Sequence, residues 1–202
     1  MIMMSLETLN NNSEFFKIAH ISEEYDISSF SCKKGPGLEQ YLKSFALDDE
    51  RCYTSRTYLI ISKISNEVVA YFSLRTGLIT ISRGWFHGFD AYPGIELANF
   101  AVNDNYKERE DAIKHFGVYV FTVFILPLVQ DISKYVGSTF LFIYALPEDK
   151  LLNHYSTMGF SRMSARMSKF IYRHVKPNYD RGCIFMYQNI ELDNGDSEEQ
   201  LI

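Results

Sequence analysis

The fold is decided by three segments between residues 95 and 136: IELANFAV at 95–102, the polar NDNYKEREDAIK at 103–114, and GVYVFTVFILPLVQDISKYV at 117–136. The first segment is apolar enough for a buried β-strand. The last has an apolar stripe at helical spacing, and it predicts a long helix kinked at Pro127, where proline removes a backbone donor. The N-terminus of a helix after such a loop presents unpaired N–H groups suited to a pyrophosphate. Taken alone, the unit fits an ordinary strand–helix connection better than a ligand site.

The rest of the chain shows alternating strand and helix signals around this unit. Apolar content, β-branched residues and turn residues predict the following elements: a helix at Gly37–Phe45, strands at Thr57–Ser62, Val68–Leu74, Thr139–Leu146, Met163–Tyr172 and Cys183–Gln188, and a short helix at Glu148–Met158. Residues 76–90 are broken up by glycines, and we expect a variable loop there. This order predicts an α/β (α+β) fold with a mixed sheet and a crossover helix.

Charge is distributed unevenly over the 202 residues, which suit a single domain. The net charge of −5 comes from residues 191–202, which carry five acids and no base. The basic stretch, residues 161–181, has six bases and one acid, and it indicates either an anionic partner or a solvated strand face. We expect a flexible N-terminus at 1–14, one domain at 15–190 and an acidic, disordered tail at 191–202.

Several function classes receive no support from the sequence. No apolar run reaches the roughly 18 residues that cross a bilayer, and the N-terminus has no signal-peptide pattern. Three widely spaced cysteines, Cys32, Cys52 and Cys183, argue against a disulfide framework. No cysteine or histidine pair has the spacing of metal ligands, and His154 is expected on the surface. These features predict a cytoplasmic protein without a structural metal and without a membrane partner.

The segment ALPEDKLLNHYSTMGF at 145–160 resembles the closing motif of GNAT (Gcn5-related) N-acetyltransferases. The resemblance covers roughly residues 30–188 and implies a mostly antiparallel central sheet flanked by helices. It also implies that the Tyr155 phenol lies near the sulfur of CoA and protonates the departing thiolate. A phenol with a pKa of about 10 stays protonated at neutral pH and can donate. The alternative is that Tyr155 is a core aromatic at helical spacing with Leu151 and Leu152.

The same resemblance implies a binding site for acetyl-CoA as cosubstrate. The residues that it places there are Phe100, Ala101 and Val102 through their main chain, Lys114, His115, Phe116, Gly117 and Val118 around the pyrophosphate, and Asn153. The loop departs from the family pattern, because His115 stands where the first glycine is usual. A Cβ there could hinder close approach to phosphate.

Glu96 is interpreted either as a general base or as a buried carboxylate paired with a cation. Glu96 and Asn99 lie on opposite faces of an ideal strand. A β-bulge, which the resemblance implies for this strand, would decide which of the two faces the cleft.

These residues predict an acyl-CoA-dependent N-acetyltransferase that moves an acetyl group to a primary amine by direct attack. The acceptor is expected to be a small molecule or a peptide, and a homodimer is left open. One alternative is a toxin-type acetyltransferase that acts on aminoacyl-tRNA and uses the basic stretch for RNA phosphates. Another is a non-catalytic acyl-CoA-binding or interaction module, which the altered loop would explain. The opening segment, residues 30–45, is most similar to the toxin-type subgroup.

Overall fold

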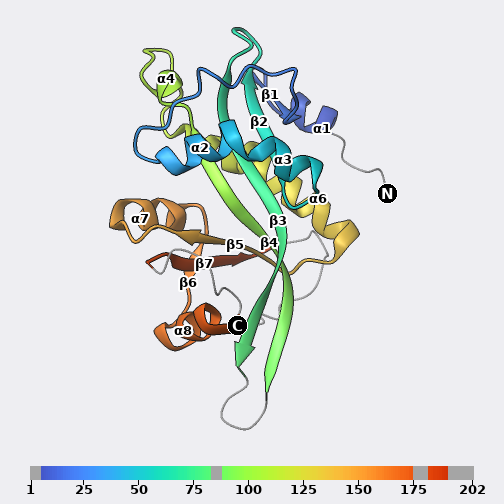
Figure 1. The fold of residues 1–202 in the computed structure, drawn as a ribbon, viewed down its shortest axis with the longest axis vertical. Helices are drawn as coiled ribbons and strands as arrows, with labels where there is room; N and C mark the ends of the chain where they lie inside the picture. Colours follow the sequence, from blue (N-terminus) through green and yellow to red (C-terminus); the bar gives the residue numbers. More distant parts are fainter. Residues whose placement is uncertain (1–5, 83–87, 175–181, 191–202) are drawn as a thin grey trace.

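The computed structural model describes residues 6–82, 88–174 and 182–190, and Figure 1 shows their arrangement. Seven strands form one sheet in the order β1-β2-β3-β4-β5-β7-β6. The strands are β1 (Phe16–His20), β2 (Arg56–Ser62), β3 (Val68–Ser82), β4 (Phe89–Val102), β5 (Phe140–Ala145), β6 (Ser161–Arg162) and β7 (Ile184–Asn189). Only β4 and β5 pair in parallel among these described strands. The predicted mixed, mostly antiparallel sheet flanked by helices is therefore confirmed.

Helices cover both faces of this sheet. They are α1 (Leu6–Asn11), α2 (Pro36–Ser44), α3 (Ala46–Arg51), α4 (Asp104–Lys107), α5 (Phe116–Val120), α6 (Leu126–Val136), α7 (Asp149–Thr157) and α8 (Ala165–His174). Alternation along β2 separates two cores. Ile60 packs in the core that holds α5 and α6, whereas Leu59 packs in the core beneath Leu42 of α2 and Ala46 of α3.

The predicted long helix is present as one run, Phe116–Val136, with a π-helical segment at Phe121–Ile125 between α5 and α6. In that segment the Leu126 N–H donates to the Phe121 carbonyl, five residues back. This wider turn directly precedes Pro127, so the helix absorbs the missing proline donor there. By length and composition the run could cross a bilayer, with a mean hydropathy of 1.7. Half of it is buried inside the fold, as expected for a core helix.

The predicted strand Met163–Tyr172 is wrong, because most of this segment is the helix α8. Ile171 is fully buried there, in a third core with Ile79, Phe142 and Phe185. The apolar residues fall at helical intervals, at positions 163, 167, 170 and 171. The strand prediction overlooked this spacing. The short strand β6, at residues 161–162 just before this segment, pairs with β7.

The expected loop at 76–90 is wrong for residues 76–82, 89 and 90, because they belong to the paired strands β3 and β4, and residues 83–87 lie outside the described residues. Gly77 and Gly94 face each other in this strand pair, and the Phe142 ring lies over them. A Cβ at Gly77 would come within 2.6 Å of that ring, so glycine is required for β5 to pack here. The glycines that suggested a loop therefore serve a close strand contact.

The N-terminal segment contains a short helix. Within the predicted flexible segment 1–14, residues 6–11 form α1, and Leu9 is fully buried. The Asn10 side chain also accepts a hydrogen bond from the Ile18 N–H of β1 at 2.6 Å. The segment therefore contains a packed helix at residues 6–11, its flexibility stays a prediction, and residues 1–5 lie outside the described residues. The predicted acidic tail, residues 191–202, lies outside them as well.

Candidate functional site

The sheet opens between β4 and β5. Their parallel pairing covers only three residue pairs and ends at Glu96 with Phe142. Beyond that pair β4 runs on to Val102 and β5 to Ala145, and Figure 1 shows β5 turning away toward α7. Two strand edges that part in this way leave main-chain groups without a ladder partner. The second half of β4 is therefore the part of the sheet best able to offer its backbone to a ligand.

The end of β4 directs part of its main chain toward this opening. Asn103 N–H donates to the Val69 carbonyl of β3 at 2.8 Å, so hydrogen-bonded pairs alternate back from there along β4. Ala101 consequently bonds to β3, whereas Phe100 and Val102 point their N–H and C=O groups to the opposite edge. Of the three residues predicted to bind through their main chain, two have the required orientation.

A β-bulge in β4 sets the direction of its polar side chains. The register shifts so that Ala98 has no partner on β3, while Asn99 pairs with Ser73 and Glu96 with Arg75. Without the bulge, Glu96 and Asn99 would lie on opposite faces. With it, both lie on the face covered by α2 and α3. The bulge implied by the resemblance is thus present, although no glycine or other local signal in the sequence marks its position.

His115 begins the long helix in an unusual backbone conformation. It is the N-cap residue of α5 with φ 57° and ψ 37°, in the left-handed region that glycine adopts most easily. Its carbonyl accepts from the N–H groups of Val118 and Tyr119, so the helix starts immediately after it. The His115 side chain and neighbouring Lys114 are exposed. The substitution of histidine for glycine therefore preserves the backbone path of the loop.

Three segments far apart in sequence meet at Gly117. A Cβ built on Gly117 would lie 3.3 Å from His154 Nε2 and 3.8 Å from the Phe100 ring. The site thus joins β4, α5 and α7. Burial, with a contribution from the charge of His115, lowers the pKa of His154, so its imidazole is neutral at pH 7. His154 was expected on the surface, and this placement is a correction that only the packing of α7 reveals.

Tyr155 is held by the end of α7. The Phe160 N–H donates to the Tyr155 carbonyl and the Gly159 N–H to the Ser156 carbonyl, while Gly159 has φ 93°. These contacts form a Schellman motif, so the predicted glycine cap is confirmed. The Tyr155 ring packs edge-on against Phe160, and burial raises the pKa of its phenol to about 12. Its hydroxyl has no hydrogen bond within the described part of the chain.

Glu96 lies in an ion pair. The Arg75 guanidinium donates to both of its carboxylate oxygens at 2.9 Å, and the Glu96 side chain is 9% exposed. Both carboxylate oxygens therefore already accept hydrogen bonds from a cation. The arrangement is that of the second interpretation, a buried carboxylate paired with a cation. A role for Glu96 as general base stays a prediction.

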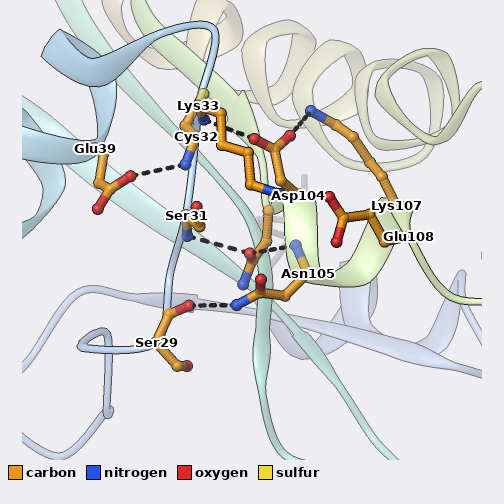
Figure 2. Close-up of polar contacts among 10 residues, drawn as sticks. Ser29, Ser31, Cys32, Lys33, Glu39, Asp104, Asn105, Lys107 and Glu108 are labelled. Carbon is orange, nitrogen blue, oxygen red and sulfur yellow. Dashed lines mark hydrogen bonds and ion pairs between the residues drawn. The ribbon is translucent and has the colours of Figure 1, made fainter.

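The segment before α2 is tied across the end of β4, as Figure 2 shows. Asp104 accepts from the Lys33 N–H at 2.6 Å, and Asn103 Oδ1 accepts from the Ser31 N–H at 3.2 Å. Asn105 adds a bond from its side chain to the Ser29 carbonyl. These bonds hold the segment as a fixed wall beside the end of β4.

The remaining predicted site residues take different positions. Phe116 is buried in the main core against Phe16 and Tyr106, so it supports the loop from below. Val118 is partly buried, and Asn153 is exposed on α7. Nothing in the described residues brings three or more metal-binding side chains together. Cys52 is exposed, Cys32 and Cys183 are buried, and none of these three cysteines is in a disulfide within the described residues.

Solved structures with the same architecture include toxins and their complexes. A tyrosine-to-phenylalanine mutant of the AtaT toxin is 17% identical, with a TM-score of 0.64 over 86% of this chain and 89% of that one. The KacTA–DNA complex is 18% identical, with a TM-score of 0.59 over 87% and 93%. Both toxins are of the GNAT type. The chain has the GNAT fold. No family model and no curated protein sequence matches it.

A third structure with this GNAT fold is AtaT complexed with acetyl-methionyl-tRNAfMet, 16% identical, with a TM-score of 0.59 over 84% of this chain and 93% of that one. In the present chain the GNAT fold brings together three parts: the half of β4 that has no β5 partner, the start of α5 and the end of α7. The arrangement offers main-chain groups, one neutral imidazole and one protonated phenol around a single opening in the sheet.

Proposed function

We propose that this protein is an acetyl-CoA-dependent N-acetyltransferase that acetylates the amine of an aminoacyl-tRNA. The observation that supports the acetyl transfer is the parting of β4 and β5 beyond Glu96 and Phe142, next to the start of α5 and the phenol of Tyr155. The AtaT structures with acetyl-CoA and with acetyl-methionyl-tRNAfMet support the choice of cosubstrate and of acceptor.

The residues present suit a phosphate-bearing thioester cosubstrate. Phe116 and Gly117 provide the first N–H groups of a 21-residue helix. They precede Val118 and Tyr119, whose N–H groups donate to the His115 carbonyl. Lys114 adds a positive charge beside them, and the left-handed backbone at His115 turns the loop as a glycine would. Phe100 and Val102 direct main-chain groups to the edge where an extended pantetheine arm would lie. Acetyl-CoA, when bound, supplies an activated acetyl thioester.

The chain's own residues then provide positioning and one proton. The main chain of β4 orients the thioester, and the fixed segment at residues 29–33 limits access from the α2 side. Burial raises the pKa of the Tyr155 phenol to about 12, and the phenol is protonated at neutral pH with or without this shift, so it has a proton to donate to a departing thiolate. Arg75 occupies Glu96, and the attacking amine is expected to lose its proton to water instead.

The decisive experiment measures acetyl transfer from labelled acetyl-CoA to aminoacyl-tRNA by the purified protein. Counting label in precipitated RNA avoids thiol reagents, which the exposed Cys52 would consume. Label should appear on charged tRNA and be absent from uncharged tRNA. Transfer to small amines or peptides but not to aminoacyl-tRNA would favour the general acetyltransferase. Absence of transfer to any amine would favour the non-catalytic module.

A further inference from the structure

The helix α8 carries three bases on one side. Arg166, Lys169 and Arg173 are all exposed, and their spacing of three and four residues places them in one row. The row extends about 10 Å along the helix axis. Arg162 on β6 is exposed just before it, and the described residues from 159 to 174 contain no acid. We call the three side chains Arg166, Lys169 and Arg173 the α8 basic row.

Within the described residues, no carboxylate neutralises the α8 basic row. None of its members has an ion pair or a hydrogen bond with another described residue. Bases around α2, α3 and α4 differ, because each of the following has a carboxylate partner: Lys33, Lys43, Arg51, Arg56, Lys107 and Arg109. An unpaired row of like charges repels itself, and an external anion would relieve that repulsion.

The opposite side of α8 is already occupied. Ile171 lies across the helix from the basic row and is fully buried against Ile79, Phe142 and Phe185. An amphipathic helix that binds a membrane needs its apolar side for the lipid, and in α8 that side packs on the core. The exposed row also contains no large apolar side chain of the kind that anchors a protein interface. The charges alone therefore define the partner.

We propose that the α8 basic row is the docking surface for the phosphate backbone of the RNA acceptor. This inference rests on the proposed function and adds to it the surface that holds the acceptor. Three bases in a row can follow the phosphates of one strand, and each contact formed would release counterions. Contacts of this kind position RNA without reading its sequence. In Figure 1, α8 lies below the strands β5, β6 and β7, whereas α2 and α3 lie above them.

The test compares tRNA binding by three proteins. One is the wild type, one carries Arg166→Ala, Lys169→Ala and Arg173→Ala, and the control carries Lys34→Ala, Lys43→Ala and Arg51→Ala. The control removes the same charge from exposed bases near α2 and α3. Alanine keeps helix propensity, and thermal melts verify that both variants fold. Binding of uncharged tRNA is followed by fluorescence anisotropy between about 50 and 200 mM salt.

The α8 variant should bind tRNA about tenfold or more weakly, and its salt slope should fall by about 2 to 3, while the control stays within about twofold of the wild type. Equal losses of tRNA affinity in both variants, or no loss in either, would overturn the assignment of the α8 basic row as the docking surface. Binding of the wild type to phosphatidylserine vesicles with no binding to tRNA would also overturn it, in favour of a membrane partner.

Activity separates this inference from the proposed function. If the wild type acetylates aminoacyl-tRNA and the α8 variant does so with an unchanged KM, the surface is wrong and the function stands. If the wild type acetylates no aminoacyl-tRNA but the α8 variant alone loses tRNA binding, the function is wrong and the surface stands. We expect the α8 variant to raise KM for aminoacyl-tRNA and leave kcat within about twofold, because the row touches no reacting atom.

Discussion

Arg75 grips Glu96 through two parallel hydrogen bonds, Nε to Oε2 and Nη2 to Oε1, each 2.9 Å long. The two residues are neighbours on β3 and β4, directly beside the bulge at Ala98. A bidentate pair of this kind fixes both side chains and occupies both oxygens of the carboxylate. The contact therefore bears on stability and on the assignment of a general base at once.

Arg75→Ala should lower the free energy of unfolding by about 3 kcal/mol, because it leaves a nearly buried carboxylate without its cation. Glu96→Gln should be milder in stability, and it should keep kcat within roughly tenfold if Glu96 is structural. Urea unfolding and steady-state kinetics on the two variants measure these effects. A fall in kcat of about a hundredfold or more in a stably folded Glu96→Gln protein would instead make Glu96 the base.

His115→Gly should stabilise the protein by about 1 kcal/mol, because glycine adopts the left-handed backbone without strain. Acetyl-CoA should bind this variant as tightly as the wild type or more tightly, since the Cβ near the helix start is gone. Isothermal titration with acetyl-CoA and thermal melts provide the two measurements. His115→Ala is the control for the side chain alone, and a large loss of affinity in both variants would identify the imidazole as a phosphate ligand.

Acetyl-CoA should raise the melting temperature of the wild-type protein. At a ligand concentration 100 times Kd, linkage stabilises the folded state by about 2.7 kcal/mol, which a thermal shift assay detects readily. Gly117→Ala should reduce the shift, because its Cβ would lie 3.3 Å from His154 Nε2 and force a rearrangement at the site. An unchanged melting temperature at millimolar acetyl-CoA would contradict the proposed cosubstrate.

Tyr155→Phe should lower kcat by about 10²–10⁴-fold, the usual loss for a general acid, with little change in acetyl-CoA affinity. Stability should hardly change, because the Tyr155 hydroxyl makes no hydrogen bond within the described residues and the ring contact with Phe160 is retained. Burial raises the pKa of the phenol to about 12, so Tyr155 should contribute no ionisation to the rate profile between about pH 6 and 9.

Two results would contradict this role for Tyr155. Full turnover in Tyr155→Phe would mean that water or the amine's own proton serves the thiolate. A heavy loss of stability would mean that the hydroxyl has a buried partner and that the residue belongs to the core. Tyr119→Phe is a matched control, because its hydroxyl donates to Ser13 Oγ at 2.8 Å, and its loss should cost stability and leave kcat unchanged.

Asp104→Asn should destabilise the wall beside β4 by about 1 kcal/mol at pH 7, because the carboxylate accepts from the Lys33 N–H and from Lys107. Burial alone would raise the pKa of Asp104, but those contacts outweigh it and the pKa lies below its usual 3.8. A lowered pKa stabilises the fold above pH 3.8, and this contribution is lost as the pH falls through the folded value. The difference between wild type and variant should therefore shrink in acid, which urea unfolding at several pH values would measure.

Local patterns in the sequence were enough for the elements whose signal is complete within a few turns. The strand around residues 95–102, the long helix after Gly117 and the Gly159 cap each follow from periodicity or from one backbone requirement. The order of those elements also predicts the mixed sheet, because crossover rules leave few topologies. The closing motif with Tyr155 is likewise complete within sixteen consecutive residues, 145–160, of the chain.

Tertiary contacts decided the rest. Whether 163–172 became strand or helix depended on a core that Ile79 and Phe142 supply from distant strands, and the glycines of the β3–β4 hairpin are explained only by the Phe142 ring above them. Arg75 with Glu96, and His154 beside Gly117, are pairs separated by 21 and 37 positions in the chain. Such pairs carry no local signal, because strand register and helix packing place them, and these form only when the whole domain folds.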